Sequence, residues 1–206
     1  MTLNKLRYGA INNKKIILFL LGLCIIGIIG GSLFMTIISK SDQTMVKEYM
    51  ANFMKNMSSI DYKSSIINST LTNLLFIISI WLLGISVIGI PIIVFMYFSK
   101  LFTLGFSLSS FIITYKTKGL LLALIYLFPS QILSIAIYTL ITLYAIKISN
   151  NLIYSVFNKR EVRFRPIINK YIYILIICLI ASLICVVYDN LVLPIIFKRL
   201  IVILKI

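Results

Sequence analysis

Few residues of this chain could take part in acid–base, nucleophilic or metal chemistry. The sequence has no histidine, which excludes serine–histidine and cysteine–histidine pairs and histidine-ligated metal sites. Cys24, Cys178 and Cys185 all fall in apolar stretches, and the last two are seven residues apart on one expected helix. That spacing is about 10 Å along a helix axis, too far for a disulfide bond. We expect no metal site and no cofactor.

The carboxylates do not form a catalytic pair either. No two of the five are placed by helix geometry to meet inside a membrane, as a paired-carboxylate hydrolase or a proton relay would require; they are Asp42, Glu48, Asp61, Glu161 and Asp189. The glycine-rich loops that bind phosphates are also absent. We therefore expect no catalytic residues and a protein that is not an enzyme.

The composition places the chain in a membrane. With 61% hydrophobic residues, 12% charged residues and a mean hydropathy of +1.07, it could not cover its apolar surface as a soluble monomer. The net charge of +15 comes from short basic clusters beside apolar runs, which is typical of topology signals and contacts with anionic lipid. We expect the lipid bilayer as a partner and no nucleic acid.

The apolar runs predict an all-α fold, a polytopic integral membrane helix bundle with about five transmembrane helices and one extracytoplasmic amphipathic helix. The whole chain, 1–206, is expected to form a single multi-pass domain. Its spans are expected at about 16–38, 71–90, 91–115, 119–148 and 171–193, with an outer connection at 39–70 and a basic cytoplasmic connection at 149–170.

The boundary between the second and third spans stays open. If Lys100 marks a turn at the membrane surface, the second span runs up to that lysine, and a slightly short third span follows it. If the chain breaks at Gly89 to Pro91, Lys100 lies inside the third span. Both alternatives give five spans.

The outer connection contains an amphipathic helix. Apolar side chains recur there at three- and four-residue spacing, among them Met45, Tyr49, Phe53 and Met57, and Ser41 or Asp42 is expected to cap its start. The apolar face either packs on lipid or on the bundle, or it docks an extracytoplasmic partner. These four residues are the candidate partner-binding site.

Small and helix-breaking residues mark other positions inside the spans. Gly27 and Gly31 form a small-xxx-small pair that lets two helices approach closely. A second group is expected to make kinks and intramembrane packing contacts, since proline removes an amide donor and Gln131 needs a hydrogen bond across the bundle. This group is Gly84, Gly89, Pro91, Gly105, Pro129, Gln131 and Asp189.

Four motifs resemble the stage II sporulation protein M family of endospore-forming bacteria. They are LeuGlyIleSerValIleGlyIlePro at 83–91, the stretch from Lys100 to Gly105, ProSerGlnIleLeu at 129–133 and AspAsnLeuValLeuPro at 189–194. The chain departs from the broader superfamily, which tends to carry histidine, glycine and glutamate where this sequence has Ser130, Gln131 and Ser134. Asp189 stands where the family usually shows glutamate.

The resemblance implies a role in engulfment of the forespore. It implies a membrane scaffold that localises and holds two cell-wall enzymes, stage II sporulation proteins D and P, a lytic transglycosylase and an amidase. The location that follows is the sporulation septum and the engulfing mother-cell membrane. The alternative function is a transporter or channel subunit whose broken helices line a pathway. The oligomeric state stays open.

The basic residues predict the orientation of the chain. The cytoplasmic side carries an excess of lysine and arginine, and both the N-terminal segment and the connection at 149–170 are rich in them. With five spans, the N-terminus is cytoplasmic and the C-terminus lies outside. Alkaline phosphatase fused after Ile206 should therefore be active in intact cells. If the phosphatase were inactive and a cytoplasmic reporter fused at the same position were active, the C-terminus would be cytoplasmic. The chain would then have one span fewer or one span more than predicted.

Overall fold

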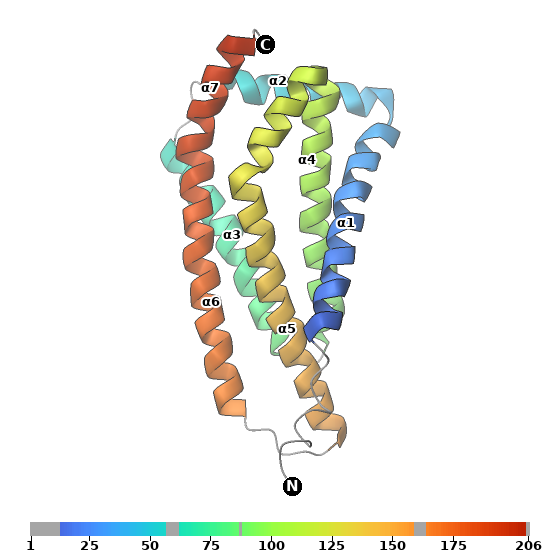
Figure 1. Ribbon diagram of the computed structural model, residues 1–206, viewed down its shortest axis with the longest axis vertical. Helices are drawn as coiled ribbons and strands as arrows, with labels where there is room; N and C mark the ends of the chain where they lie inside the picture. Colours follow the sequence, from blue (N-terminus) through green and yellow to red (C-terminus); the bar gives the residue numbers. More distant parts are fainter. Residues whose placement is uncertain (1–12, 57–61, 87, 159–163, 205–206) are drawn as a thin grey trace.

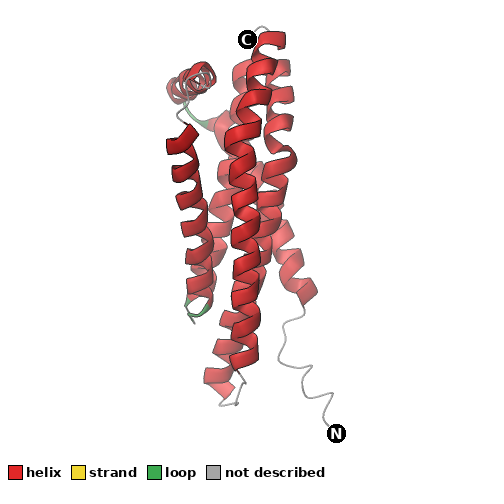
Figure 2. Ribbon diagram, turned by 90° about the vertical axis from the view of Figure 1, so that its left-hand side faces the viewer, coloured by secondary structure: helices red, strands yellow, loops and turns green. Residues whose placement is uncertain are grey.

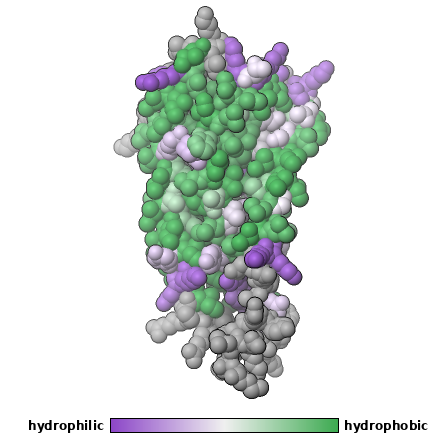
Figure 3. All heavy atoms as spheres, in the orientation of Figure 1, coloured by the Kyte–Doolittle hydropathy of each residue, from purple (hydrophilic) through white to green (hydrophobic). Residues whose placement is uncertain are grey.

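The computed structural model describes residues 13–56, 62–86, 88–158 and 164–204, and this part of the chain is helical apart from two short turns, with no strand. This confirms the predicted all-α fold. Four helical stretches within it are apolar and long enough to cross a bilayer: Lys14–Ile37, Ser64–Gly84, Gly89–Ser155 and Ile167–Leu200. Figure 3 shows a broad apolar surface with hydrophilic side chains gathered toward its two ends, as a protein surrounded by lipid requires.

The longest apolar stretch crosses the bundle twice. Its 67 residues would form a helix of about 100 Å, whereas the hydrocarbon core is about 30 Å thick. The chain instead reverses at Lys116, whose φ is 51°. Gly119 then lies so close to Phe111 that a Cβ atom would overlap the Phe111 carbonyl. Helix α4 (Gly89–Tyr126) thus holds an outgoing and a returning segment, and the chain passes five times along the bundle (Figure 1).

One helix lies across the end of the bundle while the others run along it. Figures 1 and 2 show α2 (Lys40–Asn56) crossing one end, and the start of α1, the end of α5 and the start of α6 at the opposite end. We call these the α2 end and the α5–α6 end. In addition to α2 and α4, the described part of the chain contains α1 (Asn13–Ile37), α3 (Tyr62–Gly84), η1 (Leu127–Gln131), α5 (Ile132–Asn158), α6 (Phe164–Val187), η2 (Tyr188–Val192) and α7 (Leu193–Leu204). The elements η1 and η2 are short π-helical turns.

The turn between α3 and α4 decides the boundary that the sequence left open. Helix α3 ends at Gly84 and α4 begins at Gly89, so Lys100 lies inside the third span and the second span ends before the expected residue 90. Ser86 holds the turn, because its carbonyl accepts hydrogen bonds from the Gly89 amide (3.3 Å) and from the Ser149 hydroxyl (2.6 Å). A Cβ atom on Gly89 would overlap the Leu83 carbonyl, so only glycine fits.

The expectation of a kink at Pro91 was wrong. Pro91 lies in the first turn of α4, where an amide has no intrahelical partner and its loss removes no hydrogen bond. Gly105 does not interrupt a helix either, since α4 is helical on both sides of it. The sequence signals a break here, but the break is a turn between two helices.

The start of α2 is capped by a different residue from those expected. Ser39, rather than Ser41 or Asp42, precedes the helix, and its Oγ accepts a hydrogen bond from the Asp42 amide (3.2 Å) and donates one to the Asp42 carboxylate (2.7 Å). The Gln43 side chain points back to the carbonyls that end α1, including that of Ile38 at 3.3 Å. These contacts set the sharp corner between a helix along the bundle and one across it.

Helices α1 and α4 pack backbone against backbone. A Cβ atom on Gly31 would overlap the Phe102 carbonyl, and one on Gly105 would overlap the Ile28 carbonyl. Gly27 adds a third close contact, because its Cβ would lie 2.9 Å from Leu101 Cβ. Ser32 Oγ donates a hydrogen bond to the Gly105 carbonyl (3.1 Å). Glycines on both helices therefore allow the approach.

This contact predicts different effects for two alanine substitutions on one helix. Gly31→Ala should destabilise the protein by about 1–3 kcal/mol, because the new methyl group overlaps α4 backbone that cannot move aside. Gly22→Ala is the matched control, since nothing lies within 4 Å of its Cβ position. Thermal unfolding in detergent measures both. Equal stability of the two variants would contradict the packing described.

Candidate functional site

Two polar pockets lie next to each other among the helices. The inner pocket has a volume of about 170 Å³ and the outer pocket about 230 Å³, and Tyr126, Gln131 and Asp189 line both. We call the two together the polar chamber. The inner pocket is also lined by Asn73, Lys100, Leu101, Thr103, Leu104, Ser107, Ser134, Ile135 and Tyr138. The outer pocket is also lined by Phe53, Ser65, Ser69, Asn190, Leu193 and Pro194.

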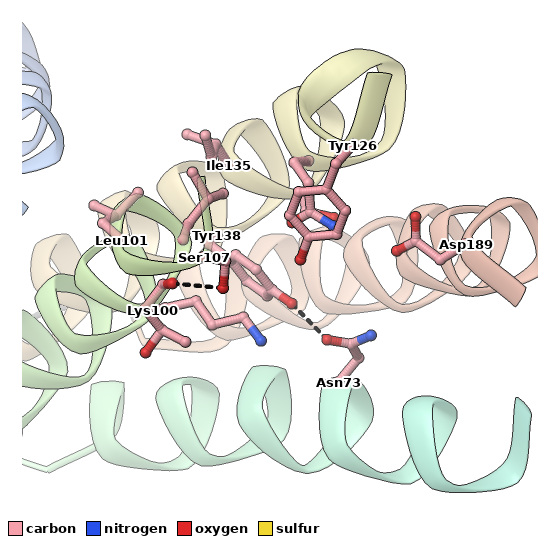
Figure 4. Close-up of a pocket in the computed structure, with 12 residues that line it drawn as sticks. Asn73, Lys100, Leu101, Ser107, Tyr126, Ile135, Tyr138 and Asp189 are labelled. Carbon is pink, nitrogen blue, oxygen red and sulfur yellow. Dashed lines mark hydrogen bonds between the residues drawn. The ribbon is translucent and has the colours of Figure 1, made fainter. Parts of the chain in front are cut away.

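Lys100 brings a positive charge to the inner pocket. It lies on the outgoing segment of α4, and Figure 4 shows it beside Tyr138. Its Nζ sits 5.5 Å from the centre of the Phe76 ring and 5.4 Å from that of the Tyr138 ring. Such contacts stabilise an ammonium group where water is scarce. Within the described part of the chain Lys100 makes no hydrogen bond, so its three N–H donors remain available.

Asp189 brings a negative charge to both pockets. It lies in the first turn of η2, and Figure 4 shows its carboxylate on a different side of the inner pocket from Lys100. Asp189 Oδ1 is buried and has no hydrogen-bond partner. The hydroxyl of Ser130 is near, but it is also buried without a hydrogen bond. One hydroxyl could supply only one of the several hydrogen bonds that a carboxylate accepts.

Neutral polar groups complete the walls of the chamber. The Tyr138 hydroxyl donates to Asn73 Oδ1 (2.7 Å), and the Ser65 hydroxyl donates to Asn190 Oδ1 (2.6 Å). Gln131, expected to form a hydrogen bond across the bundle, forms none with another described residue and faces the chamber instead. The expectation of that hydrogen bond was wrong, because the amide borders a cavity.

The chamber is closed toward the α5–α6 end. Below it the bundle is filled by side chains that are almost completely buried. Tyr171 donates a hydrogen bond to the Trp81 carbonyl (3.0 Å), and the two rings stack at 5.5 Å. The fully buried members of this core include Ile77, Ile80, Ile93, Tyr97 and Ile141. Among the described residues, the polar chamber therefore ends at this apolar core.

Helix α2 presents two apolar faces. Met50 and Met54 are 9% and 6% exposed and pack against the cluster that contains Phe111 and Phe197. On the other face, Met45 is 65% exposed and Tyr49 70%. Phe53, 39% exposed, lies between these faces and lines the outer pocket. Met57, the fourth candidate partner-binding residue, lies outside the described residues.

The remaining predicted site residues lie at contacts between helices. Gly27, Gly31 and Gly105 lie in the α1–α4 contact, and Gly84 packs against Ala145 of α5 and the Tyr171 hydroxyl. Pro129 lies in η1, next to Phe128, whose φ and ψ of −108° and 134° interrupt the helix. This interruption brings Gln131 into the chamber wall. Of all these positions, only Gln131 and Asp189 share the chamber.

Sequence reasoning missed several chamber residues. Asn73, Tyr126 and Tyr138 were not singled out, and Lys100 was treated mainly as a mark of the span boundary. A signal was present, because polar side chains are costly in an apolar span and usually face the bundle interior. The sequence does not show that these residues line one cavity, since they are far apart along the chain. Lys100, for example, is on α4 and Asp189 is on η2.

The described side chains offer no set for metal chemistry. No group of three or more cysteine and carboxylate side chains in the described ranges is arranged to hold a metal ion. The chamber instead offers one ammonium, one carboxylate, amides and hydroxyls. Groups of these types bind polar molecules and ions through charge and hydrogen bonds.

The fold and the chamber define a class, a multi-pass helical membrane protein with a polar site inside its bundle. The family model described as stage II sporulation protein M matches residues 12–186, and the chain belongs to this family. Membership implies a membrane protein of sporulation and engulfment, in a family that is generally non-enzymatic. The matched range contains three of the four motifs and ends before Asp189. No curated protein and no solved structure matches the chain significantly.

Hydration of the chamber can be tested with two cysteines on α3. In a chain whose three native cysteines are replaced, Ser69→Cys in the outer pocket should react with a water-soluble maleimide at least about tenfold faster than Ile77→Cys in the apolar core, since buried apolar thiols are inert. Mass spectrometry follows the labelling. Equal rates at the two positions would contradict a water-filled chamber.

Proposed function

We propose that this protein is a non-enzymatic membrane scaffold that holds peptidoglycan hydrolases at the sporulation septum during engulfment. The partners proposed are stage II sporulation proteins D and P, a transglycosylase and an amidase. Membership of the stage II sporulation protein M family supports the cellular setting. The observation that carries the proposal is the exposed apolar face of α2, with Met45 and Tyr49 at its centre.

The attachment of α2 supports its use as a docking surface. Met50 and Met54 anchor one side of the helix in a buried cluster. The face with Met45 and Tyr49, which line a groove beside Phe106 of α4, is therefore held in a fixed position. A pre-positioned apolar face loses little conformational entropy when a partner binds. Tyrosine and methionine are also enriched in protein interfaces, where they provide a large and adaptable contact area.

The proposed orientation puts this face on the side of the cell wall. The α5–α6 end adjoins the basic connection at 149–170, which the excess of lysine and arginine assigns to the cytoplasm. Helix α2 lies at the opposite end (Figure 1). Wall hydrolases act on that side, so their extracytoplasmic domains are the occupants we propose. A lipid surface is the competing occupant, and the experiment distinguishes the two.

The test uses charged substitutions on the two faces of α2. Met45→Asp with Tyr49→Asp should reduce co-purification of the two hydrolases from sporulating cells at least about tenfold, because loss of buried anchors at an interface costs roughly 2 kcal/mol or more. Thr44→Asp is the control, since it adds a negative charge at an exposed position of the same helix, about 100° around the axis from Met45 and farther from Tyr49.

Membrane fractionation separates loss of docking from loss of insertion. Both the double variant and the control should remain in the membrane at the level of the unmodified protein. Unchanged co-purification of the double variant would reject α2 as the contact. If α2 leaves the membrane surface in the double variant while the hydrolases remain bound, the exposed face with Met45 and Tyr49 contacts lipid rather than the hydrolases.

The polar chamber supports a second candidate function, a transporter subunit. Intramembrane charged residues are a general mark of ion and substrate sites, and Lys100 and Asp189 both line the chamber. Yet the apolar core closes the chamber toward the α5–α6 end, so the conformation described contains a binding cavity rather than a path. The scaffold remains the function that the geometry supports best.

A further inference from the structure

The polar chamber contains two opposite charges that do not neutralise each other directly. Lys100 Nζ has aromatic rings as neighbours and no hydrogen-bond acceptor among the described residues, and Asp189 Oδ1 is buried without a donor. No direct ion pair joins them within the described part of the chain, although both line the inner pocket. Charged groups buried without partners are strongly destabilising. The chamber therefore suits an occupant that supplies a partner for each charge.

The two charged residues favour a ligand that carries both a negative and a positive charge. A lone anion near Lys100 would also meet the negative field of Asp189, and a lone cation near Asp189 would meet that of Lys100. In a pocket of low dielectric constant these repulsions are larger than in water. A molecule that carries both charges in the right order satisfies both groups and meets neither repulsion.

The other polar side chains of the inner pocket suit a ligand with hydrogen-bonding groups between its charged ends. Tyr126, Gln131 and Ser134 line the inner pocket together with Lys100 and Asp189. The Gln131 amide forms no hydrogen bond with another described residue, so it can donate to and accept from a bound molecule. Water can solvate these groups, whereas a zwitterion also brings an opposite charge next to each of the two charged residues.

The volume limits the size of the occupant. The inner and outer pockets, about 170 and 230 Å³, are each smaller than the range of roughly 300–1,000 Å³ found for sites of drug-sized ligands. A molecule of amino-acid size fits one pocket, and a dipeptide would extend into both.

We propose that the polar chamber is a binding site for a small zwitterion, with the carboxylate of the ligand at Lys100 and its ammonium group at Asp189. Amino acids and short peptides with free ends have this chemistry. The ligand enters from the α2 end, because Phe53 of α2 and Ser65 of α3 line the outer pocket while the apolar core closes the other end. This proposal is independent of the scaffold function, and it requires no hydrolase.

The experiment measures binding by titration calorimetry to the full-length protein in detergent. The probes are glycine, β-alanine, 4-aminobutanoate and glycylglycine, whose charges are progressively farther apart. At least one should bind with a Kd tighter than about 1 mM, and the best of them reports whether the site suits an amino acid or a peptide. Acetate and methylammonium, each with a single charge, should bind at least about tenfold more weakly, since each leaves one of the two charged residues without a charged partner.

Matched variants assign the two charged ends. Lys100→Met and Asp189→Asn should each weaken binding of the best zwitterion at least about tenfold, because each removes a charged hydrogen bond. Lys170→Met is the control for the lysine, since Lys170 also lies over a ring, that of Tyr144 at 5.7 Å, but is exposed and outside the chamber. Glu48→Gln is the control for the acid and is exposed on α2. Both controls should bind as the unmodified protein does.

Three results would overturn the proposal. The first is no heat of binding for any of the four zwitterions up to about 10 mM, well above the expected Kd, which would mean that the chamber holds water alone. The second is equal affinity for acetate or methylammonium. The third is unchanged affinity in a correctly folded Lys100→Met or Asp189→Asn variant. If a variant does not fold, the comparison of probes on the unmodified protein decides the question without it.

Discussion

The close approach of α1 to α4 is the contact on which the rest of the bundle depends. Lipid tails are as apolar as leucine, so helices in a membrane are not driven together by the hydrophobic effect and need dense packing or hydrogen bonds. Glycines on both helices supply that packing, and the Ser32 hydroxyl adds a bond to the Gly105 carbonyl. The outgoing segment of α4 is thereby fixed, and it carries Lys100. The position of the charge inside the bundle thus follows from a contact made by residues without side chains.

Helix α3 is held in a different way, by hydrogen bonds to later parts of the chain. Its side chains and carbonyls, with the turn that follows, pair with α5, α6 and η2 through the bonds Asn73 to Tyr138, Trp81 to Tyr171, Ser86 to Ser149 and Ser65 to Asn190. Interhelical hydrogen bonds of this kind contribute roughly 0.6–2 kcal/mol each. Two of them lie in the chamber wall, so the same polar residues bind the helices together and give the cavity its hydrophilic surface.

Local patterns in the sequence were sufficient for the helical class, the presence of several long apolar helices and the family. They could not choose between Lys100 and Gly89 as the end of a span, because a proline after two glycines fits a kink as well as a helix start. They also missed the cap at Ser39, where several short polar residues follow one another. The chamber was out of reach for a physical reason: Lys100 and Asp189 come together only through the packing of α4 and η2, and no spacing rule relates residues on separate helices. The resemblance reached further than the spacing rules, and the family match bears it out over residues 12–186.

Phe53 borders the exposed face of α2 that carries Met45 and Tyr49, and it also lines the outer pocket of the polar chamber. A protein that binds to that surface would touch the side chain that a chamber ligand must pass or displace. If docking moves Phe53, the affinity of the chamber changes, and thermodynamic linkage then requires that a chamber ligand change the affinity for the docked protein by the same factor. One phenylalanine would make assembly at the membrane surface responsive to a small molecule, with no contact between the two ligands.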